Sequence, residues 1–229
     1  MTEGTDFIEI PGLGLSVATT PSPDKGKSVY EATRLLDSQL LVLPGSREWT
    51  EALAYFEGHD QREAVTSMII AGYGRKGGNS PEITRSIIAW PDANGNYSDI
   101  LNPRPQKGNY TLLIEGYKVK SETVETPPKK EGEEPGKMTV YTLTDVVVVG
   151  EIPNLPQRDG ILEEDIHVLG LTKGAYFFST SNTKYEQGLR AVVRGWSGSD
   201  IDSHTAAYAR MGPSSDKMSG LTFRAAKRI

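Results

Sequence analysis

The sequence predicts a strand-rich α+β protein in which an antiparallel sheet, sandwich or barrel carries two or three helices in the N-terminal half. Three observations support this class. Glycine occurs 24 times and proline 14 times among 229 residues, which favours short elements joined by turns. Helical spacing of apolar residues is confined to the first third of the chain, whereas runs rich in β-branched residues follow residue 83. Hydrophobic residues make up 37% of the chain, which is enough for a packed core.

Residues 1–27 are expected to form an extended arm attached to a single α+β domain of residues 28–229. Phe7–Ile10 and Leu13–Val17 could form short strands. The prolines and glycines around them are expected to stop the segment from folding back as a regular hairpin. Its backbone donors would then pair with the sheet edge of another subunit. The sequence therefore predicts an arm that lies on a neighbour.

Two helices are expected after this arm. Ser28 and Glu31 have the spacing of a capping box, so the first helix begins at Ser28. The second spans 47–57, with Ser46 as its cap and Gly58 at its end. Its apolar residues fall on one face: Trp49, Ala52, Leu53 and Phe56. The intervening run 39–43 is expected to form a buried strand that Pro44 and Gly45 close.

A third helix is expected at 61–71, because Asp60 can cap it and Glu63 follows three residues later. The β-branched content leaves a strand as the alternative for residues 64–71. Beyond it, Ile83–Trp90 and Tyr97–Leu101 flank Asn94 and Gly95, a dipeptide typical of tight hairpin turns. These two runs are therefore expected to pair with each other.

The longest strands are expected at Tyr110–Lys120 and Met138–Val149, joined as a hairpin. Four consecutive valines, Val146–Val149, favour a strand buried on both faces. The segment 121–137 between the strands holds five Glu, three Lys and three Pro, and is interpreted as a protruding, solvated hairpin loop. Further strands are expected at 166–170, 174–180, 189–195 and 220–226.

Two glycine-containing segments partly match catalytic or nucleotide-binding motifs. Gly72–Gly77 has the GxGxxG pattern, which binds a pyrophosphate when it follows a strand and opens a helix. Here it more naturally follows a helix, so a flexible glycine turn is expected. Gly195–Ser199 is one residue short of the GxSxG nucleophile elbow around Ser197, and is interpreted as a turn after a strand.

Two polar clusters contain side chains of the kind that bind metal ions. Asp200, Asp202 and His204 alternate along the chain and could converge on a divalent cation, but a short helix at 203–211 would disperse them. Asp92, Asn94 and Asn96 lack the glycine and glutamate that a calcium loop requires, because Tyr97 and Pro103 occupy those positions. His59 and His167 have no partner at ligand spacing. No catalytic, cofactor-binding or metal-binding residue is therefore assigned, and no cofactor is expected.

Composition limits the partners. The absence of cysteine excludes disulfides, thiolate zinc sites and cysteine nucleophiles. The net charge of −5 argues against general attraction to nucleic acid or anionic membranes. Residues 184–229 carry a local charge of +4, which leaves −9 on residues 1–183. This asymmetry favours docking between subunits over nucleic-acid binding. No signal peptide and no apolar run of about 18 residues is found, so synthesis in the cytoplasm without a membrane span is expected.

This organisation resembles, in type and through no particular motif, that of virion components such as bacteriophage tail-tube or capsid proteins. Those proteins are similarly poor in cysteine, rich in strands and equipped with arms and hairpin loops that bind neighbours. The resemblance implies a non-enzymatic, self-assembling structural protein that forms a homo-oligomer, binds other particle subunits and is incorporated into a virion. A partner- or ligand-binding module is the alternative, and an enzyme with an unfamiliar site is the third possibility.

Overall fold

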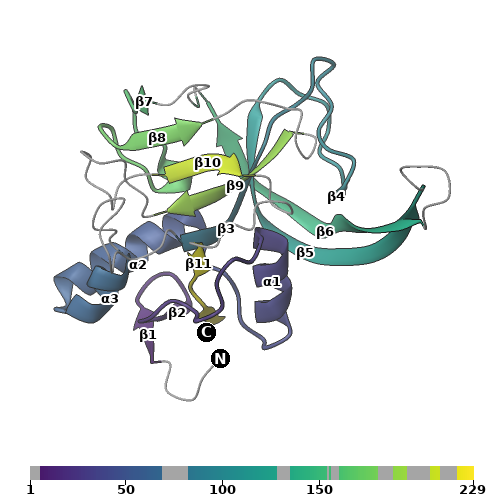
Figure 1. Ribbon diagram of the computed structural model, residues 1–229. Helices are drawn as coiled ribbons and strands as arrows, with labels where there is room; N and C mark the ends of the chain where they lie inside the picture. The colour runs from purple at the N-terminus through teal and green to yellow at the C-terminus, as the bar shows by residue number, and fades with distance from the viewer. Residues whose placement is uncertain are drawn as a thin grey trace.

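The computed structural model describes residues 6–68, 82–127, 135–153, 155, 160–179, 188–194, 207–211 and 221–229. In these ranges three α-helices accompany a three-stranded and a nine-stranded sheet, which makes a strand-rich α+β fold (Figure 1). The larger sheet is mixed and does not close into a barrel, so the barrel alternative is wrong for the described residues.

The nine-stranded sheet has the order β4-β6-β5-β3-β9-β10-β8-β7, and β11 pairs with β3 outside this path. Its strands are β3 (Glu82–Ala89), β4 (Leu101–Asn102), β5 (Thr111–Thr126), β6 (Gly136–Ile152), β7 (Gly160–Ile161), β8 (Tyr176–Ser179), β9 (Leu189–Arg194), β10 (Ala207–Met211) and β11 (Thr222–Phe223). Neighbours from β6 to β10 are antiparallel. The parallel pairs are β4 with β6, β8 with β10 and β11 with β3. Strand β3 is buried on both faces and forms the centre of the sheet.

The smaller sheet contains β1 (Phe7–Ile10), β2 (Leu15–Ala18) and β12 (Ala226–Arg228). Strands β1 and β2 form an antiparallel hairpin, so the expectation that this segment could not fold back is wrong. The turn is made by Gly12 and Gly14, both at positive φ, because glycine adopts this conformation without a steric penalty. Leu15 and Val17 are fully buried in the core of their own chain. Within residues 7–18, the structure therefore shows a core hairpin and no free arm.

The helices are α1 (Val29–Asp37), α2 (Ser46–Gly58) and α3 (Arg62–Met68). The capping box of α1 is confirmed, since Ser28 Oγ accepts from Glu31 N–H at 3.2 Å and Glu31 Oε2 accepts from Ser28 N–H at 3.0 Å. Helix α1 packs on β3 and β5, whereas α2 packs on β3 and β9. The two helices therefore support adjacent parts of the same sheet.

The expected apolar face of α2 is confirmed, with its members buried: Trp49, Ala52, Leu53 and Phe56. The helix begins one residue earlier than expected, with Gly45 as its cap. Ser46 instead lies in the first turn, where its Oγ donates to the carbonyl oxygen of Leu169 at 2.7 Å. Residues 62–68 are helical, which favours the helix over the alternative strand, and residues 69–71 lie outside the described ranges.

The hairpin expected around Asn94 and Gly95 is wrong. Strand β3 pairs with β5 and β9, and the run after the turn forms only β4, which lies parallel to β6. The carboxylate of Asp92 accepts from the backbone N–H groups of Asn94 and Asn96, both at 2.8 Å. A local turn held by a side chain therefore replaces the expected strand pair.

Two further expected strands are also wrong. In the run 39–43 only Val42 forms a bridge, with Ala226, and Leu40 is exposed. In place of a strand at 166–170, the chain forms a short 3₁₀ helix at His167–Leu169, ended by Gly170 at positive φ. The expected strands at 174–180, 189–195 and 220–226 are present in shorter form as β8, β9 and the pair β11 and β12.

The β5–β6 hairpin is confirmed, and it is longer than expected. The strands continue to Thr126 and resume at Gly136, so much of the supposed loop 121–137 is paired backbone. The hairpin projects from the body as a curved two-stranded ribbon (Figure 1). Alternation of β-branched and polar residues along both strands explains why pairing persists beyond the sheet.

Candidate assembly surface

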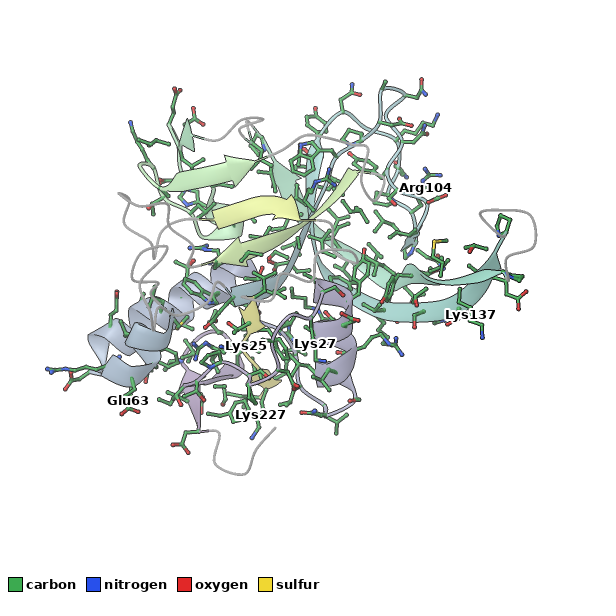
Figure 2. All side chains as sticks on the ribbon, in the orientation of Figure 1. Lys25, Lys27, Glu63, Arg104, Lys137 and Lys227 are labelled. Atoms are coloured by element: carbon green, nitrogen blue, oxygen red, sulfur yellow. The ribbon has the colours of Figure 1, made fainter. Side chains whose placement is uncertain are left out.

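The projecting part of the hairpin, called here the hairpin arm, consists of residues 120–126 and 136–142. Its pairs run from Lys120 opposite Thr142 to Thr126 opposite Gly136. No residue of the hairpin arm is buried. Helix α1 contacts only its inner end, where Arg34 Nη1 donates to Ser121 Oγ at 2.6 Å and Tyr30 packs against Tyr141. Figure 2 shows the outer side chains, including Lys137, pointing into open space.

One face of the hairpin arm carries an apolar cluster near its tip. Val124 lies directly opposite Met138, and Val140 follows two residues along the same face. Met138 is 52% exposed. A two-stranded ribbon without a packed face is only marginally stable in water. Among the described residues, the hairpin arm therefore lacks the second layer that would bury this cluster.

A second exposed apolar region lies at the base of the hairpin, on β6. Val147, Val148 and Val149 are 57%, 39% and 52% exposed, so the expectation of a strand buried on both faces is wrong. Strand β4 pairs only with Leu143 and Thr144, and no described strand pairs with this edge of β6 beyond them. Gly116 on β5 leaves room for Val147, because a Cβ at Gly116 would meet the Val147 Cβ at 2.8 Å.

The turn after α1 presents a third exposed apolar side chain. Leu41 N–H donates to the Leu36 carbonyl at 2.9 Å and Leu40 N–H donates to the Asp37 carbonyl at 3.1 Å, the two bonds of a Schellman motif. This motif places Leu40 at φ 57°, where glycine is usual. A non-glycine residue there costs about 1 kcal/mol or more. Leu40 is also 93% exposed, so no contact in the described chain offsets that cost.

Leu40 and Val149 line the same groove, which has a volume of about 650 Å³ and is called here the Leu40 groove. Leu41, Val42 and Gly116 complete its apolar lining. Its lining residues Gly116, Lys118 and Val149 belong to the base of the hairpin and not to the hairpin arm. The apolar part of this concave surface includes the Leu40 side chain, which is exposed to solvent.

Charged groups surround the Leu40 groove. The cations are Arg85, Lys118 and Arg228, and the acids are Asp37 and Glu115. Burial raises the pKa of both carboxyl groups, and for Glu115 a hydrogen bond from Ser86 Oγ partly offsets the effect. Lys118 and Arg228 are themselves paired, with Asp145 at 2.8 Å and with Glu48 at 3.8 Å, so the groove carries no excess of positive charge.

A second groove, of about 540 Å³, lies between the end of β6 and the segment 161–168. Its acidic lining consists of Glu151, Glu163, Glu164 and Asp165. The His167 Nε2 atom lies 3.9 Å from Asp165 Oδ2, and the two side chains are 85% and 44% exposed. Among the described residues no group of three potential ligands is arranged to hold a metal ion.

A buried polar network joins the two sheets to α2. Arg224 donates through Nη2 to Glu82 Oε1 at 2.6 Å and through Nη1 to the Ala18 carbonyl at 2.7 Å. Trp49 Nε1 donates to the other Glu82 oxygen at 2.9 Å. Arg224 and Glu82 are 0% and 1% exposed. Because these buried groups form hydrogen bonds with one another, we assign the network a role in stabilising the fold.

Arg194 extends this network and lies above the Trp49 ring at 5.1 Å. Its Nη1 donates to Ser46 Oγ and to the Leu169 carbonyl, both at 3.1 Å. Burial lowers the pKa of Arg194 to about 9, so the side chain remains a cation at neutral pH. The arginine thereby joins β9 to the first turn of α2 and to the short 3₁₀ helix.

Most of the motifs named from the sequence lie outside the described residues. Gly72–Gly77, Ser197 and the trio Asp200, Asp202 and His204 lie outside the described residues. The Asp92 turn is described, and hydrogen bonds from Asn96 and Asn94 to its carboxylate lower the pKa of Asp92. His59 is exposed and stacks on Tyr55 at 3.9 Å, with its Nδ1 2.8 Å from the Tyr55 carbonyl.

Comparison with protein families, with curated proteins and with solved structures finds no match for this chain. Among the described helices, none is both long and apolar enough to cross a membrane. The surfaces described above are therefore the basis for inferring what the protein does.

Sequence patterns missed both Leu40 and the valines at the base of the hairpin. The position of the valines depends on an irregular part of the ladder, in which Val147 lies opposite Gly116 and Val148 opposite Ile114. For Leu40 no signal existed, because a leucine within an apolar run is ordinarily a core residue.

Proposed function

We propose that this protein is a non-enzymatic, self-assembling structural subunit of the type found in virions, such as a bacteriophage tail-tube or capsid protein. The observation that carries the proposal is the hairpin arm, a two-stranded ribbon with an apolar cluster at Val124, Met138 and Val140 that no part of the described chain covers. Such a ribbon gains its missing layer when it docks on another molecule.

Two further features support assembly over catalysis. The exposed valines on β6 form an apolar edge of the kind that marks protein contacts. The most enclosed ionic groups, Glu82 and Arg224, bond to each other and to backbone. A partner- or ligand-binding module is the second candidate, and the acidic groove lined by Glu163, Glu164 and Asp165 favours it.

The proposal is tested by the particle mass of the purified chain in dilute solution, with negative-stain images of the same sample. The key variant replaces residues 122–140 with Asn-Gly, which retains the Arg34–Ser121 hydrogen bond and the Tyr30–Tyr141 contact. We expect the full chain to form regular oligomers and this shortened chain to be a folded monomer by circular dichroism. A strictly monomeric full chain at high concentration would contradict the proposal.

A further inference from the structure

A continuous line of hydrogen bonds runs from the Leu40 groove to the short 3₁₀ helix. Its first member is Glu115 Oε1, which accepts from the Ser86 hydroxyl group. Ser86 Oγ accepts from the Ser46 N–H at 2.7 Å, and Ser46 Oγ donates to the Leu169 carbonyl at 2.7 Å. Glu115 lines the groove, whereas the last three residues are 0% exposed. Water therefore reaches this line of hydrogen bonds from the Glu115 end.

The first turn of α2 and the end of the 3₁₀ helix are in direct contact. A Cβ at Gly170 would lie 2.9 Å from the Cα of Arg47, so the two backbones approach closely. Arg194 Nη1 also donates to both Ser46 Oγ and the Leu169 carbonyl, at 3.1 Å in each case. Because closely packed groups transmit displacements, a shift of Ser46 is passed to the 3₁₀ helix.

The 3₁₀ helix supplies part of the wall of the acidic groove, through His167 and Val168. We propose that ionisation of Glu115 breaks the line of hydrogen bonds at Ser86 and thereby loosens this wall. Protonation of the carboxyl group restores it. The two grooves are then coupled within one chain. The coupling is a property of the single chain and is independent of the proposed assembly.

The two protonation states of Glu115 place different demands on its surroundings. The neutral carboxyl group can keep its place, because its carbonyl oxygen accepts from Ser86. A Cβ at Gly45 would lie 2.6 Å from Glu115 Oε1, which shows how closely the start of α2 encloses the carboxyl group. An ionised group loses hydration in such a position and gains it in the adjoining groove. Ionisation therefore favours a carboxylate turned toward the groove, which leaves Ser86 without its acceptor.

Charged and polar groups on the neighbouring elements act on Glu115. Burial is the largest influence and raises the pKa of this carboxyl group, while the Ser86 hydrogen bond partly offsets it. Glu48 on α2 raises the pKa further, whereas the Ser46 N–H and Arg85 lower it. The other charged groups nearby are Asp37 on α1, Arg47 on α2, Lys118 with its partner Asp145, and Arg228 on β12. Because burial outweighs the hydrogen bonds, the enclosed position favours the neutral carboxyl group.

Hydrogen exchange measured by mass spectrometry on the full chain and on Glu115→Gln tests the coupling. Glutamine has the shape of the neutral carboxyl group and cannot ionise, so it keeps the line of hydrogen bonds closed. At pH 8 we expect residues 44–50 and 166–172 to exchange about 2- to 10-fold faster in the unsubstituted chain, the range for loss of one hydrogen bond. At pH 4 we expect the two proteins to exchange alike, because Glu115 is then mostly neutral. Equal rates at pH 8 would overturn the coupling.

Asp37→Asn is the matched control. Asp37 lines the same groove and burial also raises its pKa, but it lies on α1 and outside the line of hydrogen bonds. We expect Asp37→Asn to exchange at pH 8 as the unsubstituted chain does. Equal slowing in Asp37→Asn and Glu115→Gln would contradict the proposal, because it would assign the effect to the general charge of the groove.

Ser86→Ala tests the transmission. The substitution removes the hydroxyl group between Glu115 and Ser46 and leaves both of these residues in place. We expect residues 166–172 of this variant to exchange faster than those of Glu115→Gln by the same factor at pH 4 and pH 8. A general effect of Glu115 on stability does not require Ser86 and would persist in this variant. A factor that still rises from pH 4 to pH 8 would therefore overturn the proposed route.

Discussion

The base and the arm of the β5–β6 hairpin belong to one continuous antiparallel ladder, yet their surroundings differ sharply. At the base, Leu113, Ile114 and Leu143 are fully buried. In the arm, where pairing continues with the same two strands, no residue is buried. Backbone pairing alone therefore does not create a core. Burial begins where β3 and α1 lie against the ladder and ends where they stop.

The largest expected effect comes from truncating the base. Leu143→Ala removes a fully buried side chain from the cluster that includes Tyr117 and Ile114, and should reduce the free energy of unfolding by about 2–5 kcal/mol. Urea denaturation followed by circular dichroism measures this loss. A loss below about 1 kcal/mol would show that the base is no better packed than the arm.

An intermediate effect is expected from pH, through Glu115 at the base. Burial raises the pKa of this carboxyl group above its ordinary value of 4.5. The stabilising contribution of the protonated group is complete below the unfolded pKa and is lost as pH rises through the higher folded pKa. Unfolding measured between pH 4 and pH 7 should show a decline in stability that Glu115→Gln reduces. Asp37 is present in both proteins, so their difference reports Glu115 alone.

The smallest effect on folding is expected in the arm. Met138→Ala shortens an exposed side chain and should change the free energy of unfolding by about 0.5 kcal/mol or less. The same substitution should weaken the proposed assembly, because Met138 belongs to the exposed apolar cluster of the hairpin arm. Thermal melts of the monomer and sedimentation velocity measure the two quantities. A large loss of monomer stability would indicate that the arm packs against the rest of its own chain in solution.

Sequence reasoning succeeded where the determining contacts are local. The Ser28–Glu31 capping box, the buried face of α2 and the two long strands were all predicted, since each depends on residues close in sequence. It failed for the pairing of β3, because the backbone N–H groups of Asn94 and Asn96 donate to the Asp92 carboxylate and form a local turn in place of the expected hairpin. The exposed apolar residues of the candidate site were not predicted. Their exposure depends on where the neighbouring strands end, which the local sequence does not determine.

The N-terminal segment shows the same limit. Its strand pieces were predicted, but β2 finds its second partner in β12, at the other end of the described chain. Such long-range pairs have no local signature, and their formation depends on the packing of everything between them. The glycines that suggested breaks in fact form the turn that closes the β1–β2 hairpin.

The pairing of β2 with β12 also has a consequence for the timing of synthesis. Leu15 leaves the ribosome roughly two hundred residues before its partner Arg228, a delay of about 10–40 s at ordinary translation rates. The same late strand holds the turn at Leu40, because Val42 and Ala226 exchange two backbone hydrogen bonds of 2.9 and 2.8 Å. A nascent chain is therefore expected to lack the bridge that holds this turn until Ala226 has left the ribosome, which would delay contacts between neighbouring chains on one polysome.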